Sequence, residues 1–146
     1  MRRMETRDLP DVLAIENISF PNPWHETTFR GEIQNDGLSY PLVFVHRTLE
    51  RVIGYIVYWK IRDEVQINNI AVHPDFKRMG VGETVLRDVI EAARAEGAHF
   101  VSLEVRPSNT AARRLYAKLG FEFIGFRRHY YSSPDEDAIV LGLNLS

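Results

Sequence analysis

Residues 77–82 combine a basic pair with two glycines, directly before an apolar helical pattern. The start of a helix leaves its first N–H groups unpaired and carries partial positive charge, so it attracts anions. Glycines let the backbone approach such a ligand closely, and phosphate suits the unpaired N–H groups. Lys77 and Arg78 add cationic charge beside it. The spacing therefore predicts a phosphate-binding loop.

Two known glycine-rich motifs are alternatives for this loop. A Walker-type loop requires G-x-x-x-x-G-K-[ST], which the sequence lacks. A dinucleotide fingerprint requires G-x-G-x-x-G. Gly80 and Gly82 fit it and Glu104 supplies a downstream acidic residue, but Val85 replaces the third glycine. That fingerprint also opens the first strand–helix unit of its fold, whereas this loop lies in mid-chain. Glycines that serve only a tight turn are the remaining alternative.

Glu104 is a candidate for proton transfer. It stands between Leu103 and Val105 in a predicted strand, where a carboxylate is unusual. Strand alternation places it on the same face as Ser102. A carboxylate in that position can act as a general base. It can equally be solvated or paired with the nearby Arg106, and the residues alone leave these alternatives open.

Tyr116 is a candidate proton donor. It lies in a predicted helix, just off the apolar stripe of Ala111, Leu115 and Leu119. A phenol with a pKa near 10 is protonated at neutral pH and can donate. Tyrosines that simply pack at the edge of a core are also common. Asn109, which precedes this helix, is a plausible cap.

Other polar and aromatic residues give weaker signals. Trp24, Tyr130 and Tyr131 could line a peptide groove, although aromatic side chains also pack in cores. The histidines show neither metal-ligand spacing nor an H-E-x-x-H motif, so no metal site is predicted. His73 precedes a proline and is interpreted as a turn residue. The acidic residues 135–137 are interpreted as a solvated turn, with an acidic patch for a basic peptide as the alternative.

The hydrophobic pattern predicts the mixed α/β framework that positions these residues. Four helices are expected: residues 8–18, a short segment carrying Phe29 and Ile33, the segment that ends at Gly97, and the segment between Asn109 and Gly120. Strands are expected over residues 40–46, 51–61, 64–72 and 99–105, followed by a long hairpin within residues 121–145. The first three strands form an antiparallel meander. The helix between the third and fourth strands makes that pair parallel.

The apolar pattern in the third expected strand, residues 64–72, shifts by one position partway along. Val65 and Ile67 place apolar groups at odd positions, whereas Ile70 and Val72 place them at even ones. A regular strand cannot bury both sets on one face. We therefore predict a β-bulge near Asn68-Asn69, with a strand buried on both faces as the alternative.

Composition limits the kind of protein. A chain of 146 residues that is 45% hydrophobic and 26% charged is expected to form one domain, residues 1–146. A net charge of -2 argues against bulk attraction to nucleic acid or anionic membrane. The absence of cysteine excludes disulfides, thiolate metal sites and cysteine nucleophiles. Neither a signal peptide nor a membrane-spanning apolar run is recognised, so a cytoplasmic location is expected.

Four stretches resemble a known family. NIAVHPDFKRMGVGETVL (residues 69–86) resembles the acetyl-CoA loop of GNAT-fold N-acetyltransferases, with Lys77 where Gln or Arg is more usual. The other three resemble segments of RimI-type alanine N-acetyltransferases: SLEVRPSNTAARRLYAKLGF (102–121), RRHYYSSPDEDAIVL (127–141) and NPWHETTF (22–29). Together they cover most of the chain.

The resemblance implies the GNAT fold, with a mixed, mostly antiparallel sheet of about seven strands flanked by about four helices. It also implies acetyl-CoA as co-substrate, held largely by backbone amides, and a backbone N–H near residues 70–72 as oxyanion donor. The acetyl-CoA-binding residues expected from it are Ile70, Ala71, Val72, Lys77, Arg78, Met79, Gly80, Val81, Gly82, Glu83 and Asn109.

The activity implied is acetyl transfer to the N-terminal α-amine of a protein, namely the N-terminal alanine of a small-subunit ribosomal protein. In this family the residue matching Glu104 accepts the proton and that matching Tyr116 donates one. An α-amine, with a pKa of about 7.7–8.0, is easier to activate than lysine at about 10.4. The alternatives are a GNAT enzyme acting on lysine or a small amine, and a silent acyl-CoA-binding module. We expect a monomer without metal, direct nucleic-acid contact or membrane contact.

Overall fold

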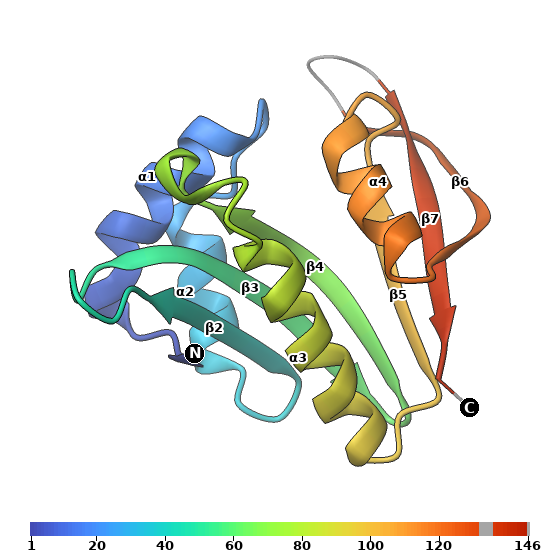
Figure 1. Ribbon diagram of the computed structural model, residues 1–146, viewed down its shortest axis with the longest axis horizontal. Helices are drawn as coiled ribbons and strands as arrows, with labels where there is room; N and C mark the ends of the chain where they lie inside the picture. Colours follow the sequence, from blue (N-terminus) through green and yellow to red (C-terminus); the bar gives the residue numbers. More distant parts are fainter. Residues whose placement is uncertain (132–135, 146) are drawn as a thin grey trace. The chain divides into compact units, whose positions relative to one another are not determined.

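The computed structural model describes residues 1–131 and 136–145 (Figure 1). Within them lie four α-helices: α1 (Leu9–Ser19), α2 (Glu26–Gln34), α3 (Val81–Ala95) and α4 (Thr110–Lys118). The strands are β1 (Arg2–Arg3), β2 (Ser39–Val45), β3 (Val52–Ile61), β4 (Glu64–Val72), β5 (Phe100–Val105), β6 (Glu122–Tyr131) and β7 (Glu136–Asn144). Short 3-10 turns, η1 (Thr6–Asp8) and η2 (Pro74–Phe76), complete the set. The strand order is β1-β2-β3-β4-β5-β7-β6. The about seven strands and about four helices that the resemblance implies are confirmed. Strand β1 was not located by the hydrophobic pattern of the sequence.

The chain forms two compact units. The first comprises Met1–Lys60 with Asn68–Gly82, and the second comprises Ile61–Ile67 with Glu83–Ser146. Strand β4 and helix α3 therefore each contribute residues to both units. The single domain expected from length stays a prediction.

In the first unit, α1 and α2 pack against β2, β3 and the end of β4. Val12 and Ile15 of α1, Phe29 of α2 and Tyr55 of β3 are fully buried in this core. Ile18, the last residue of the helix expected over residues 8–18, is apolar but 63% exposed. The buried side of α1 therefore ends before Ile18.

Asp8 stands directly before α1, but its side chain makes no capping hydrogen bond to that helix. Its carboxylate instead binds the Arg2 guanidinium at 2.7 and 2.8 Å and accepts from the Glu5 N–H at 2.8 Å. Burial raises the pKa of Asp8, but the hydrogen bonds from Arg2 and from the Glu5 N–H, together with the charges of Arg2 and Arg7, outweigh it and lower the pKa. Asp8 therefore ties β1 to η1.

Burial along β4 alternates without a break, which contradicts the argument for a phase change. Val65, Ile67, Asn69 and Ala71 are buried, while Ile70 lies at a half-buried position. The polar Asn69 takes the inward position because it donates to a buried carboxylate, that of Glu16. The bulge itself stays a prediction.

In the second unit, the first part of β4 pairs in parallel with β5, from Glu64↔Phe100 to Ile67↔Leu103, as the strand–helix–strand pattern predicted. Strand β7 pairs antiparallel with both β5 and β6, which confirms the C-terminal hairpin. The apolar helical pattern expected after the glycine loop is confirmed in α3. Its buried residues are Val85, Leu86, Val89, Ile90 and Ala93, and Val81 is half-buried.

Candidate functional site

The glycine loop follows β4 and η2 in the first unit and runs directly into α3. Arg78 and Gly80 both adopt left-handed backbone conformations, with φ of +69° and +74°. This conformation is costly for a residue with a side chain, so Arg78 is a position that the surrounding structure must hold in place. Helix α3 then begins at Val81, and its first N–H groups have no partner within the helix.

The segment before the loop is anchored. The His73 N–H donates to the Ile53 carbonyl at 2.7 Å, and His73 Nδ1 accepts from the Asp75 N–H at 3.1 Å. The Phe76 ring packs between His46 and His73, with centroid separations of 5.4 and 6.1 Å. The interpretation of His73 as a turn residue is confirmed.

The charges around the loop suit an anion. Lys77, Arg78 and Met79 are exposed. Glu83 would oppose an anion, but its carboxylate accepts from Lys118 Nζ at 2.8 Å and from Arg87 Nε at 3.1 Å. These two cations, Lys118 first, lower the pKa of Glu83, so the carboxylate is ionised and paired. Its backbone N–H remains suited to a phosphate, and the residues therefore fit the expected ligand.

The end of β4, residues 70–72, rests on a close contact with β3. A side chain at Gly54 would place its Cβ 2.8 Å from the Ala71 carbonyl oxygen and 2.7 Å from the Phe44 ring. Only glycine fits there, so Gly54 lets β3 approach the strand from which Ile70, Ala71 and Val72 are expected to bind the donor. Gly54 was not predicted from the sequence to bear on the site.

Asn109 caps α4, as predicted. Its Oδ1 accepts from the Ala112 N–H at 3.3 Å. The contact with acetyl-CoA that the resemblance implies for Asn109 stays a prediction.

Glu104 lies on the half-buried face of β5, with Ser102, while Leu103 and Val105 are buried, as alternation predicted. Its carboxylate binds Arg127 at 2.6 Å. Of the alternatives left open for Glu104, an ion pair is present, but with Arg127, whereas Arg106 pairs with Glu136. Sequence proximity could not reveal a partner that lies two strands away.

Arg106 instead holds Glu136. Its guanidinium lies 3.3 Å from Glu136 Oε1, and Ser108 donates its hydroxyl to the same oxygen at 2.7 Å. These contacts, the Ser108 hydroxyl first, lower the pKa of Glu136. The prediction of a solvated acidic turn was thus wrong for Glu136; Asp135 lies outside the described residues.

Tyr130 and Tyr131 lie close enough to Glu104 to feel its charge, and an arginine covers the ring of each. Arg127 lies over the Tyr130 ring at 4.3 Å and Arg106 over the Tyr131 ring at the same distance. Burial first, and then the charge of Glu104, raises the pKa of Tyr130 and of Tyr131. Both phenols are therefore protonated at neutral pH.

Tyr116 is the one residue of α4 that is buried, at 7% exposed. Burial raises the pKa of its phenol to about 12. Its phenol also contributes to raising the pKa of Tyr131, so the second unit brings Glu104, Tyr116, Tyr130 and Tyr131 into one electrostatic neighbourhood. Trp24 belongs to the first unit, where its ring packs on Phe29 at 5.2 Å.

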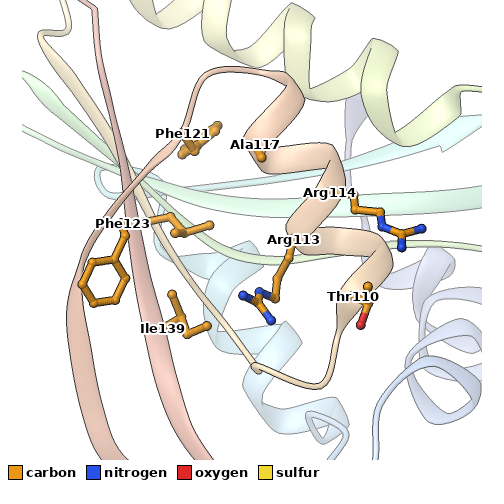
Figure 2. Close-up of a pocket in the computed structure, with 8 residues that line it drawn as sticks. Thr110, Arg113, Arg114, Ala117, Phe121, Phe123 and Ile139 are labelled. Atoms are coloured by element: carbon orange, nitrogen blue, oxygen red, sulfur yellow. The ribbon is translucent and has the colours of Figure 1, made fainter.

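A pocket lies between α4 and the β6–β7 hairpin, and it was not predicted from the sequence. It has a volume of about 470 Å³ and is lined by Thr110, Arg113, Arg114, Ala117, Phe121, Phe123, Ile139 and Leu141 (Figure 2). The Arg113 guanidinium donates to the Pro107 carbonyl at 2.9 Å. None of the residues predicted to act in catalysis or binding lines this pocket, so the pocket is separate from the candidate site.

Metal and membrane features can be assessed for residues 1–131 and 136–145. Within these ranges, no group of three or more histidine or acidic side chains is arranged to hold a metal ion. No helix in the same ranges has the length and apolarity needed to cross a bilayer.

The sequence matches a family and curated relatives. The acetyltransferase (GNAT) family model covers residues 9–121. The ribosomal protein bS18-alanine N-acetyltransferase of Escherichia coli (strain K12) is 38% identical over 145 residues, which cover 98% of this chain and 95% of that protein. The protein of the same name from Haemophilus ducreyi is 32% identical over 142 residues, 95% of each chain.

Solved structures agree with this assignment. The crystal structure of the ribosomal-protein-S18-alanine N-acetyltransferase from Escherichia coli has a TM-score of 0.88 and 35% identity, covering 99% of this chain and 92% of that one. Ard1 from Thermoplasma volcanium has a TM-score of 0.86 at 27% identity, with coverage of 98% and 95%. The expected fold is confirmed, and the chain belongs to the acetyltransferase (GNAT) family.

Proposed function

We propose that this enzyme transfers the acetyl group of acetyl-CoA to the N-terminal α-amine of a protein, namely the N-terminal alanine of a small-subunit ribosomal protein. The observation that supports this most is the half-buried Glu104 carboxylate beside the protonated Tyr130 and Tyr131, in the same unit as the buried, protonated Tyr116. The names of the relatives that align along nearly the whole chain support the choice of acceptor.

Acetyl-CoA supplies the activated acetyl group as a thioester. The backbone N–H groups of residues 78–83 would hold its pyrophosphate, because the start of α3 and the left-handed turns at Arg78 and Gly80 present donors to an anion. Lys77 and Arg78 add positive charge. Residues 70–72 of β4 would supply a backbone N–H for the oxyanion, and Asn109 a further contact with CoA.

Glu104 acts as the general base. An α-ammonium group must lose one proton before its nitrogen can attack the thioester carbonyl, and a carboxylate can accept that proton directly or through one water. An α-amine with a pKa of about 7.7–8.0 needs only modest help at neutral pH. Attack then forms the N–C bond, the C–S bond breaks, and the nitrogen loses its second proton to water.

Tyr116 acts as the general acid for the departing sulfur. With a pKa of about 12 its phenol keeps its proton throughout the neutral range. A thiol has a pKa near 8.5, so complete transfer from this phenol costs about 5 kcal/mol. Much of the stabilisation therefore comes from the O–H···S hydrogen bond before the proton moves.

Trp24, Tyr130 and Tyr131 would contact the acceptor peptide. Tyr130 is 47% exposed beside Glu104 and offers both a ring face and a hydroxyl. Trp24 follows two prolines in a loop that precedes α2. Aromatic residues with a polar group suit a peptide backbone.

Two peptides of identical, lysine-containing sequence test this function. One begins with a free alanine and the other with the same alanine blocked. The proposal predicts acetylation of the free peptide and little of the blocked one. Preference for the blocked peptide would assign the enzyme to lysine instead, and binding of acetyl-CoA without turnover on either peptide would indicate a silent module.

A further inference from the structure

Glu16 is a buried acidic residue that the acetyl-transfer steps do not use. It lies near the end of α1 and is 1% exposed. Its carboxylate accepts three hydrogen bonds: from the Trp24 N–H at 2.9 Å, the Tyr55 hydroxyl at 2.5 Å and the Asn69 amide at 2.8 Å. Burying a carboxylate is costly unless such donors satisfy it, so these contacts belong together.

Glu16 holds both ends of the loop that follows α1. Its backbone carbonyl accepts from the Phe20 N–H at 3.1 Å, and its side chain accepts from the Trp24 N–H. Between these two positions, Pro21 and Pro23 have no N–H to donate. Glu16 therefore accepts a hydrogen bond from the backbone at each end of the loop.

The other carboxylate oxygen of Glu16 reaches the sheet. Tyr55 lies in β3, and Asn69 lies in β4 directly before the residues proposed to bind the donor. A second connection runs parallel to this one. The Trp24 ring packs on Phe29 at 5.2 Å, and Phe29 packs edge-on against Tyr55 at 5.7 Å. The backbone and the ring of Trp24 are thus both fixed to Tyr55.

We propose that Glu16 is a positioning residue that fixes the loop of residues 20–25 on strands β3 and β4 so that the loop can receive the acceptor peptide. The use of the loop by the acceptor rests on the proposed function. The attachment of the loop by Glu16 stands on the hydrogen bonds alone. Loss of Glu16 then weakens acceptor binding more than donor binding, because the carboxylate touches neither substrate.

Glu16→Leu and Glu16→Gln separate the possibilities. Leucine fills the volume but leaves the Trp24 N–H without an acceptor. Glutamine can still accept from that N–H through its amide oxygen. Its NH₂ group then faces the Tyr55 hydroxyl and the Asn69 amide, and both of these can turn to accept from it. We expect Glu16→Leu to raise the KM for the acceptor peptide at least tenfold and Glu16→Gln to stay within threefold. The KM for acetyl-CoA should stay within twofold in both.

Glu32→Leu is the matched control. Glu32 also accepts from a tryptophan, the Trp59 indole N–H at 2.9 Å, but this contact joins α2 to β3 away from the loop. Its substitution should leave both KM values within twofold. If Glu16→Leu does not fold, Glu16→Asp replaces it, since the shorter carboxylate cannot reach Trp24 and the sheet together.

Nuclear magnetic resonance tests the attachment without any substrate. The chain has two tryptophans, so ¹⁵N-tryptophan labelling gives two backbone amide signals. The Trp24 amide should exchange slowly with solvent in the wild type and in Glu16→Gln, and at least tenfold faster in Glu16→Leu or Glu16→Asp. An unprotected Trp24 amide in the wild type, or an acceptor KM that Glu16→Leu leaves unchanged, would overturn the proposal. A wild type that acetylates no N-terminal peptide would contradict the proposed function, while the Trp24 amide still decides whether Glu16 holds the loop.

Discussion

The Arg127 guanidinium lies 2.6 Å from the Glu104 carboxylate and also lies over the Tyr130 ring, 4.3 Å from its centroid. The residue proposed as general base is thus already paired with a cation. A substrate ammonium group must share that carboxylate or displace Arg127. Arg127 is half exposed, which leaves it free to move away.

Arg127→Gln should therefore lower the KM for the acceptor peptide. A partly exposed ion pair contributes about 0.2–1 kcal/mol, so the decrease should not exceed about fivefold. Arg128→Gln, which removes the neighbouring exposed arginine, is the control and should change the KM little. Steady-state kinetics at fixed, saturating acetyl-CoA measures both. A large increase in KM for Arg127→Gln would mean that Arg127 binds the peptide itself.

Glu104→Gln should lower kcat by about 10²- to 10³-fold, since general-base catalysis typically contributes that much. The amide keeps the shape of the side chain but cannot accept the proton. Calorimetry should show an acetyl-CoA Kd within twofold of the wild type. Glu122→Gln, on the exposed start of β6, is the control. Unchanged kcat in Glu104→Gln would refute the assignment of the base.

The fold was largely predictable from the sequence because periodicity reports burial directly. The stripe of α3 and the inward alternation of β5 follow from spacing alone. Interaction partners that are distant in the sequence were not predictable. Glu104 binds Arg127, not Arg106. Asn69 is buried because the Glu16 carboxylate lies opposite it. Glu16 could have been found, since it lies four residues after Val12 on the buried stripe of α1. A glutamate in that position requires donors.

Tyr116→Phe should slow acetyl transfer by about 10²-fold, the size of effect seen when one donor to a developing charge is removed. Rapid-quench measurement of a single turnover isolates this step, since slow product release can hide it in kcat. Tyr40→Phe, a change to a tyrosine of β2 stacked on Tyr58, is the control. A single-turnover rate equal to that of the wild type would remove Tyr116 from the mechanism.

Tyr116 also predicts how stability depends on pH. Its folded-state pKa of about 12 lies above the ordinary value of 10.0, so the unfolded chain loses this proton first. The contribution to the free energy of unfolding is complete below pH 10 and is lost as pH rises through 12, a change of about 3 kcal/mol. Tyr55 and Tyr131 act in the same direction. In urea unfolding from pH 9 to 12, the free energy of unfolding should therefore decline less steeply for Tyr116→Phe than for the wild type. Equal slopes would contradict a raised pKa for Tyr116.

Gly80→Ala should weaken acetyl-CoA binding. Gly80 has a φ of +74° with open space around it, so alanine adds backbone strain without a clash. A left-handed residue other than glycine costs roughly 1–2 kcal/mol, and the free loop would relax to a conformation that binding must reverse. We expect the Kd to rise about 5- to 30-fold. Gly31→Ala, in α2 with similarly open space, is the control and should leave the Kd unchanged.

The central claim is that the enzyme modifies a protein α-amine, and locating the transferred acetyl group tests it most directly. Small-subunit ribosomal proteins purified without N-terminal acetylation would be incubated with the enzyme and isotopically labelled acetyl-CoA, then mapped by mass spectrometry. We expect label on the N-terminal alanine of one ribosomal protein, and its loss with Glu104→Gln. Label on lysine side chains, with unmodified N-termini, would contradict it.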